Sequence, residues 1–217
     1  MKKCAIITTY IEGNLAELLP DPEEYFVICA DGGYAQAVEA GIKPDLIIGD
    51  LDSYKGDIPK DVPIEKLPVE KDDTDTVLAA RVGLSKGCRE FHIYGATGGK
   101  RLDHTLANLQ MLLLLRRQGA RAWLYDDAFV YTALENESIT ISRTVEWGLL
   151  SVFCLGADAH GIDLEGVQYP LHDATLTAGF PLGVSNHILE PQARISVREG
   201  SLLVGWELPE QEKTEKV

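Results

Sequence analysis

The sequence predicts two folding classes in one chain: an α/β N-terminal domain with a mainly parallel sheet covered by helices, and a smaller all-β C-terminal sandwich or barrel domain. Two observations predict this division. Short apolar segments alternate with helical segments as far as Tyr125, whereas only short β-type segments follow Asp127. We therefore expect domains at residues 1–127 and 128–209, and a charged, frayed tail at 210–217.

Apolar segments with the length of buried strands recur through the first half, at Cys4–Thr8, Tyr25–Ala30, Leu46–Ile48, Phe91–Tyr94 and Ala122–Tyr125. Segments with helical character lie between them, at Tyr34–Ala40, Thr74–Lys86 and Asp103–Gln118. The last of these helices should stop at Gly119, because glycine commonly follows a helix end. Alternating strands and helices are typical of a parallel sheet with both faces covered.

The second half contains short β-type segments separated by turn residues, at Val130–Leu134, Ser138–Ile141, Leu149–Leu155, Ala174–Leu176, Ala193–Val197 and Leu202–Trp206. No segment there has convincing helical character. Several short strands with frequent turns predict a sandwich or barrel of about 80 residues.

Charge limits the partners that the chain can have. It carries 20 Lys and Arg against 34 Asp and Glu, a formal net charge of -14. A field of this sign repels nucleic acid and anionic membranes, so we expect neither as a partner. Anionic substrates such as nucleotides need a local cation to offset the carboxylates, which makes Mg2+ a candidate cofactor.

Cysteine spacing and hydropathy bear on the location of the protein. The cysteines at positions 4, 29, 88 and 154 are too far apart for a Cys-x-x-Cys motif, which favours buried free thiols in a reducing compartment. No segment reaches the roughly 18 apolar residues of a membrane span. We therefore expect a cytoplasmic protein.

Candidate ligand-binding residues follow the expected strands of the first half, because open α/β sheets bind ligands beyond the carboxyl ends of their strands. Residues 30–33 read A-D-G-G, and the paired glycines would let backbone approach a ligand closely. A plain turn explains them equally. Asp50 and Asp52 follow the next apolar segment and would point the same way in extended chain.

Carboxylates about 4 Å apart would repel by several kcal/mol at an effective dielectric near 20, so the Asp50 and Asp52 pair indicates a bound cation, a shared proton or divergence into solvent. Residues 71–75 read K-D-D-T-D at a predicted helix start. Helix capping explains one or two of these residues, but it does not require three acids and a lysine.

Residues 95–104 read G-A-T-G-G-K-R-L-D-H and join a predicted strand to a predicted helix. A glycine-rich turn in this place presents N–H groups to a phosphate, and Arg101 adds a planar cationic fork. The spacing departs from the P-loop motif, and no G-x-G-x-x-G motif occurs. The segment therefore indicates a phosphate site of another family or, alternatively, a simple capped helix.

Taken together, these motifs resemble one known family. The patterns A-D-G-G, P-D-x-I-I-G-D-L-D-S, K-D-x-T-D and G-x-x-G-G-x-R-x-D-H occur in this order before an all-β half that contains Ser185 and Asn186. In this combination the chain resembles thiamine pyrophosphokinase, and the likeness covers nearly its whole length. The resemblance implies that a diphosphoryl group passes from ATP to the hydroxyl of thiamine, giving thiamine diphosphate and AMP.

The resemblance also implies residue roles. It assigns Mg2+ binding to four acids, Asp50, Asp52, Asp72 and Asp75. It assigns catalysis to Asp50, Asp72, Arg101 and Asp103, with Asp103 meeting either the aminopyrimidine or the hydroxyl of thiamine. The remaining substrate-binding positions that it implies are Asp31, Gly32, Ser53, Thr74, Gly98, Gly99, His104, Ser185 and Asn186.

In the second half, Ser185 and Asn186 resemble thiamine-side residues of the family, although polar residues in a β turn explain them equally well. The family further implies a homodimer in which thiamine lies at the subunit interface. Two other functions stay open: a Mg2+-dependent nucleotide phosphohydrolase, and a non-catalytic sensor of thiamine or a nucleotide.

Overall fold

A computed structural model describes residues 2–11, 13–49, 56, 61–65, 74–126 and 128–209 of the chain. The described residues form two compact units. The first unit holds residues up to Met111 together with 119–126, and the second holds Leu112–Gln118 together with 128–209.

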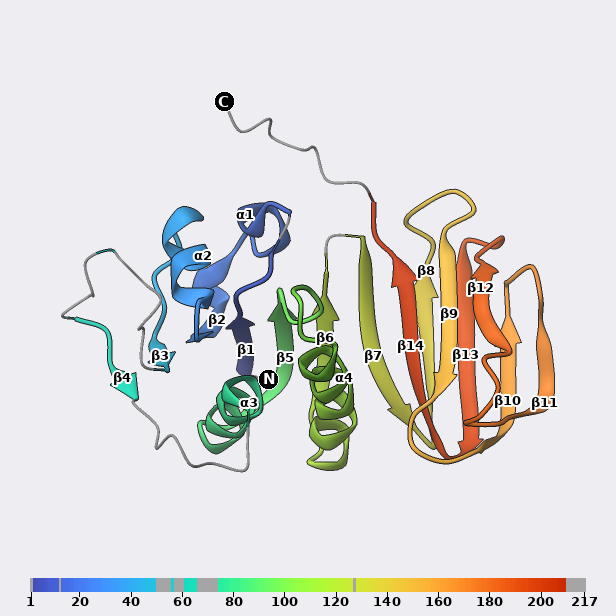
Figure 1. The fold of residues 1–217 in the computed structure, drawn as a ribbon. Helices are drawn as coiled ribbons and strands as arrows, with labels where there is room; N and C mark the ends of the chain where they lie inside the picture. Colours follow the sequence, from blue (N-terminus) through green and yellow to red (C-terminus); the bar gives the residue numbers. More distant parts are fainter. Residues whose placement is uncertain are drawn as a thin grey trace. The chain divides into compact units, whose positions relative to one another are not determined.

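The first unit is built on a parallel sheet (Figure 1). Its strands are β1 (Lys2–Ile7), β2 (Tyr25–Ala30), β3 (Leu46–Ile48), β4 (Ile64–Glu65), β5 (Cys88–Tyr94) and β6 (Arg121–Tyr125). They lie in the order β4-β3-β2-β1-β5-β6, and every neighbouring pair is parallel. The inner strands are buried on both faces, as the continuous apolar segments predict.

Helices cover both faces of this sheet. The helical elements are α1 (Leu15–Leu18), the 3-10 turn η1 (Pro22–Glu24), α2 (Gly33–Glu39), α3 (Asp75–Ser85) and α4 (Leu102–Arg117). Residues of α1 and α2 pack with Ala5, Ile7 and Val27 on one face. Gly83 of α3 packs against Phe91 on the other face. Right-handed connections place α3 and α4 on the same side, because both chain crossings run in the same direction along the sheet.

The ends of the long helices follow local sequence rules. Thr74 caps α3, because its hydroxyl oxygen accepts a hydrogen bond from Val77 N at 3.3 Å. Gly87 follows the end of α3 with φ of 84°, and Gly119 follows the end of α4 with φ of 73°. Only glycine adopts this left-handed backbone freely, so both helices stop where the sequence places one.

Strand order reverses direction next to β1. From β1 the chain adds β2, β3 and β4 on one side, then returns to add β5 and β6 on the other. The connections that leave the carboxyl ends of β1 and β5 therefore run in opposite directions along the sheet. In such folds this reversal is the usual ligand-binding position, and it predicts where the site of the first unit lies.

The second unit is a sandwich of two antiparallel sheets. One sheet contains β7 (Phe129–Glu135), β14 (Ser201–Glu207), β9 (Leu149–Cys154) and β12 (Gly183–His187). The other contains β8 (Ser138–Ser142), β13 (Gln192–Glu199), β10 (Ala159–Glu165) and β11 (Leu171–Leu176). Their inward residues, among them Leu150, Ile162 and Ile195, form one buried core.

The predicted fold class is confirmed: a mainly parallel, helix-covered sheet precedes an antiparallel β sandwich. The structure adds α1, η1, β4, β10 and β12, which the sequence did not indicate. Within the described residues, no helix is both long and apolar enough to cross a membrane.

Candidate functional site

The glycine loop, residues 95–101, leaves β5 at the reversal of strand order and leads into α4. Gly95 and Gly99 have φ of 73° and 88°, a left-handed conformation that other residues adopt only with strain. The loop therefore has the place and the backbone that an anion-binding turn requires.

Two side chains of α4 hold the glycine loop against the helix. Thr105 Oγ1 donates a hydrogen bond to Thr97 O at 2.9 Å, and Asn108 Nδ2 donates one to Ala96 O at 2.7 Å. Asn108 is 6% exposed, so its amide is committed to this contact. The sequence analysis missed both residues, although their spacing of three places them on one face of a helix.

Arg101 and Asp103 form a two-pronged ion pair at the end of the glycine loop. Arg101 Nε lies 2.9 Å from Asp103 Oδ1, and Arg101 Nη2 lies 2.6 Å from Asp103 Oδ2. The guanidinium lowers the pKa of the Asp103 carboxyl to about 2, and the same hydrogen bonds raise the pKa of Arg101. Both side chains are exposed, so an incoming anion can replace Asp103 at the guanidinium.

His104 lies in the first turn of α4, where its backbone N donates to Arg101 O at 3.1 Å. Its side chain is exposed. The loop after β1 contacts the glycine loop and was also missed by the sequence analysis. Thr8 N donates to Tyr94 O at 2.9 Å, and Tyr10 N donates to Gly95 O at 3.2 Å. These bonds tie the ends of β1 and β5 together.

The A-D-G-G segment is shaped by its contact with β1. A Cβ atom on Gly33 would lie 2.0 Å from Ile7 O, and one on Gly32 would lie 2.8 Å from Thr9 Oγ1. These glycines therefore allow α2 to approach the end of β1 closely. Asp31 precedes them with φ of 50°, at the carboxyl end of β2.

The predicted metal ligands are largely outside the described residues. Asp50, Asp52, Ser53 and Asp72 fall there, whereas Asp75 opens the first turn of α3 after the cap Thr74. Across the described part of the chain, no group of three or more His, Cys, Asp or Glu side chains is arranged to hold a metal ion.

In the second unit, Ser185 lies in a bulge of β12. The pairing of β12 with β9 shifts between Gly183 and Asn186, and Ser185 has φ of 59°. Bulges redirect side chains, and the structure places Ser185 at an exposed position. Both polar residues belong to strand β12 and not to a turn.

Asn186 has a structural contact of its own. Its Oδ1 accepts a hydrogen bond from Tyr169 N at 3.0 Å, and its Nδ2 donates to Tyr169 O at 2.8 Å. The side chain is 4% exposed. Asn186 therefore fastens β12 to the neighbouring loop, next to the bulge that presents Ser185.

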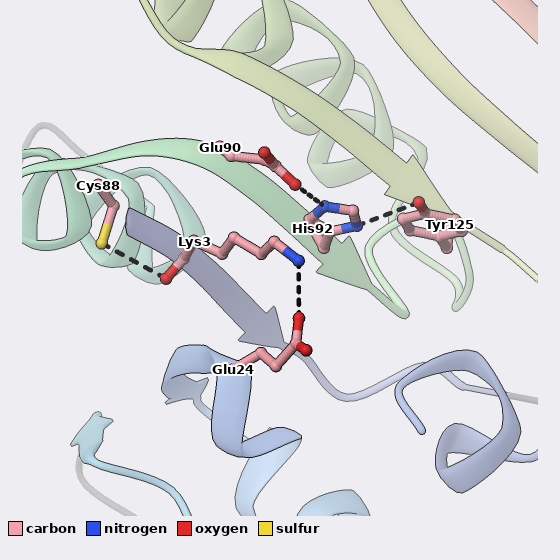
Figure 2. A network of polar contacts seen from close by, with 6 residues as sticks. All are labelled: Lys3, Glu24, Cys88, Glu90, His92 and Tyr125. Carbon is pink, nitrogen blue, oxygen red and sulfur yellow. Dashed lines mark hydrogen bonds and ion pairs between the residues drawn. The ribbon is translucent and has the colours of Figure 1, made fainter. Parts of the chain in front are cut away.

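A second polar network lies on the sheet of the first unit (Figure 2). His92 contacts Glu90 through Nε2 and Tyr125 through Nδ1, each at 3.1 Å. The rings of Tyr25 and Trp123 lie 5.2 Å from its ring. Burial among these rings lowers the pKa of His92, which stabilises the neutral imidazole.

Two small hollows lie apart from these residues. One, of about 140 Å3, is lined by Cys154, Thr177 and Phe180 in the second unit. The other, of about 250 Å3, is lined by Tyr34, Lys43 and neighbouring residues in the first unit. Neither includes a residue that the sequence analysis placed in the site.

An α/β unit with a glycine loop at its strand-order reversal, followed in the chain by a β sandwich, has the arrangement of α/β folds that bind a ligand at this edge of the sheet. Comparison with known families is more specific. The thiamin pyrophosphokinase catalytic-domain model matches residues 22–124, and the thiamin pyrophosphokinase vitamin B1 binding-domain model matches residues 136–202. The chain belongs to the thiamine pyrophosphokinase family.

Individual relatives agree with this result. Thiamine pyrophosphokinase of Bacillus subtilis is 29% identical over 204 residues, covering 89% of this chain and 95% of that protein. Thiamine pyrophosphokinase 1 of Oryza sativa subsp. japonica is 25% identical over 198 residues, covering 78% of this chain and 74% of that protein.

Solved structures show the same fold. The crystal structure of thiamine pyrophosphokinase from Bacillus subtilis matches with a TM-score of 0.86 at 24% identity, covering 95% of this chain and 99% of that one. The enzyme from Geobacillus thermodenitrificans matches with a TM-score of 0.81 at 23% identity, covering 98% and 99%.

Proposed function

We propose that the protein transfers a diphosphoryl group from ATP to the hydroxyl of thiamine, releasing AMP, as an ATP:thiamine diphosphotransferase. The observation that carries this proposal is the match of both family domains, in order, to one chain. The glycine loop supports it independently, because it lies where an α/β sheet binds a nucleotide.

The glycine loop and Arg101 are proposed to bind the phosphate chain of ATP. Backbone N–H groups of Gly98 and Gly99 donate to phosphate oxygens, and the Arg101 guanidinium exchanges Asp103 for these oxygens. This exchange frees the Asp103 carboxylate to accept a hydrogen bond from thiamine. Phosphoryl transfer depends mainly on positioning and charge stabilisation, which these groups supply. His104 and Asp31 flank the same edge of the sheet.

The proposed Mg2+ ligands are Asp50, Asp52, Asp72 and Asp75, with Ser53 and Thr74 beside them in the chain. Mg2+ prefers carboxylate oxygens as ligands, and when bound it would offset the negative charge of the phosphate oxygens. Asp50→Asn and Asp72→Asn should each nearly abolish AMP formation, with far-ultraviolet circular dichroism unchanged. Near-normal rates of both variants at saturating Mg2+ would show that the ligand assignment is wrong.

Thiamine is proposed to bind between two copies of the chain, at the first unit of one copy and Ser185 of the other, with Asn186 holding the Ser185 bulge in place. Exposed apolar side chains in both units are consistent with a partner surface: Leu102 and Leu106 in the first, and Tyr169, Phe180 and Leu182 in the second. A cytoplasmic location is proposed on the four free cysteines.

The central experiment incubates the full chain with ATP and Mg2+, with and without thiamine, and follows products by phosphorus NMR. We expect AMP and thiamine diphosphate in equal amounts, only when thiamine is present. ATP breakdown without thiamine would instead indicate a phosphohydrolase, and binding of ATP without any product would indicate a sensor. Accumulation of ADP with thiamine monophosphate would exclude a one-step transfer.

The shared site is tested by complementation. Asp50→Asn removes a proposed metal ligand, and Ser185→Gly removes the hydroxyl while keeping a residue that accepts φ of 59°. Mixed by refolding, the two inactive variants should recover about a quarter of the wild-type activity, because half the dimers are mixed and each has one intact site. No recovery, with mixed dimers confirmed by native mass spectrometry, would place the whole site in one chain.

A further inference from the structure

Tyr10, in the loop after β1, lies directly on the glycine loop. A Cβ atom placed on Gly99 would lie 2.5 Å from both Cε2 and Cζ of Tyr10, and one placed on Gly98 would lie 2.7 Å from Tyr10 Cβ. Real Cβ contacts are never this short. The tyrosine side chain therefore lies against the α-carbons of both glycines, at the carboxyl edge of the sheet.

The two glycines have different reasons for lacking a side chain. Gly99 has φ of 88°, so its backbone alone favours glycine. Gly98 does not have a left-handed backbone, and Tyr10 is the neighbour that a Cβ atom there would meet. Glycine at position 98 is thus explained by the position of Tyr10.

Tyr10 also lies near Arg101, and half of its surface is exposed. Its phenol is near enough to Arg101 to contribute, after Asp103, to the raised pKa of the guanidinium. Its backbone N donates to Gly95 O, so Tyr10 contacts the glycine loop at its first residue as well as at Gly98 and Gly99.

We propose that Tyr10 is a positioning residue for ATP: its side chain holds the Gly98 and Gly99 backbone in the conformation that presents N–H groups to the phosphate chain. This rests on the proposed function. α4 supports the loop from the helix side through Thr105 and Asn108, and Tyr10 supports it from the side of β1. The hydroxyl makes neither close contact: Tyr10 Cβ lies against Gly98, and ring carbons lie against Gly99.

The test compares Tyr10→Phe and Tyr10→Ala with the wild-type chain. Val38→Ala is the control, since Val38 is a 48% exposed apolar residue of α2 in the same unit. We expect Tyr10→Ala to weaken ATP binding by about tenfold in calorimetry. It should raise KM for ATP by a similar factor and leave KM for thiamine unchanged. Tyr10→Phe and Val38→Ala should stay within about twofold of wild type.

A double-mutant cycle gives a second readout. Gly98→Ala should weaken ATP binding by displacing Tyr10, and its effect should largely disappear in a Tyr10→Gly background, where no Cβ atom opposes it. Additive effects would overturn the proposal. So would unchanged ATP affinity in Tyr10→Ala, or a loss in Tyr10→Phe equal to that in Tyr10→Ala.

Failure of the proposed function is recognisable separately. A wild-type chain that binds ATP but makes no AMP would refute the pyrophosphokinase activity, and the affinity measurements on the Tyr10 variants would still decide the positioning role. A wild-type chain that does not bind ATP at all would overturn both proposals.

Discussion

Asn108 offers the sharpest test of how the glycine loop is held. Its side chain is buried and donates to Ala96 O at 2.7 Å. Asn108→Leu keeps the approximate shape but leaves that carbonyl without this donor, which should cost about 1–3 kcal/mol of unfolding free energy. Asn108→Asp keeps the shape and turns the donor into a carboxylate that faces the carbonyl oxygen.

The acid variant should therefore be pH-dependent. Burial and the facing carbonyl raise the pKa of the introduced acid in the folded state, and every tenfold gain in its proton affinity corresponds to about 1.4 kcal/mol of folding free energy. The folded state then binds more protons than the unfolded one, so the stability deficit should be largest near about pH 8 and should shrink towards about pH 5. The protonated acid can donate to Ala96 O and replace the lost bond.

Urea unfolding followed by far-ultraviolet circular dichroism measures this effect, because most of the described helical residues belong to the first unit. Gln110→Glu is the matched control, since Gln110 is exposed on the same helix and undergoes the same amide-to-acid change. A pH-independent deficit in Asn108→Asp, or an equal deficit in Gln110→Glu, would refute the buried-donor argument.

Two further predictions concern stability. Arg116→Met should lower the free energy of unfolding by about 2 kcal/mol, because the side chains of Arg116 and Glu137 are only 27% and 20% exposed. Arg198→Met should lower it by less than about 1 kcal/mol, because the side chains of Arg198 and Asp173 are 68% and 73% exposed. Urea unfolding of both variants measures the two losses, and equal losses would contradict the prediction. His92 has a pKa lowered below 6.5, so acidification below that value should destabilise the fold until the folded-state pKa is passed. The His92→Gln variant should not show this loss of stability on acidification. If its free energy of unfolding changed with pH in parallel with that of the wild type, another group would be responsible.

The fold was predictable where local rules and burial agree. The β2 and β3 bounds follow from continuous apolar segments, and α4 ends at Arg117 because Gly119 provides the left-handed residue. The missed elements lack such signals. β12 is short, polar and bulged at Ser185, and α1 has only four residues, so neither shows a clear periodicity of apolar residues.

The site was predictable to the level of segments. Glycines and charged residues after apolar strands indicate the carboxyl edge of the sheet, and the G-x-x-G-G-x-R-x-D-H pattern identified the glycine loop. The partners of that loop were not predictable, because Tyr10 contacts it from the loop after the neighbouring strand β1, far away in the sequence. The ion pair of Arg101 with Asp103 was not predicted either, because it depends on the conformations of the two side chains.

Position 98 shows why a glycine motif is ambiguous until its neighbours are known. Glycine can be required by its own φ, by a ligand that approaches the backbone, or by a side chain that occupies the space of its Cβ atom. Gly99 meets the first condition and Gly98 meets the third. These requirements do not exclude the second, because a backbone pressed against Tyr10 on one side can still present its N–H groups on the other. Tyr10 and the glycines therefore have to change together: a larger residue at 98 is tolerated only where position 10 gives way.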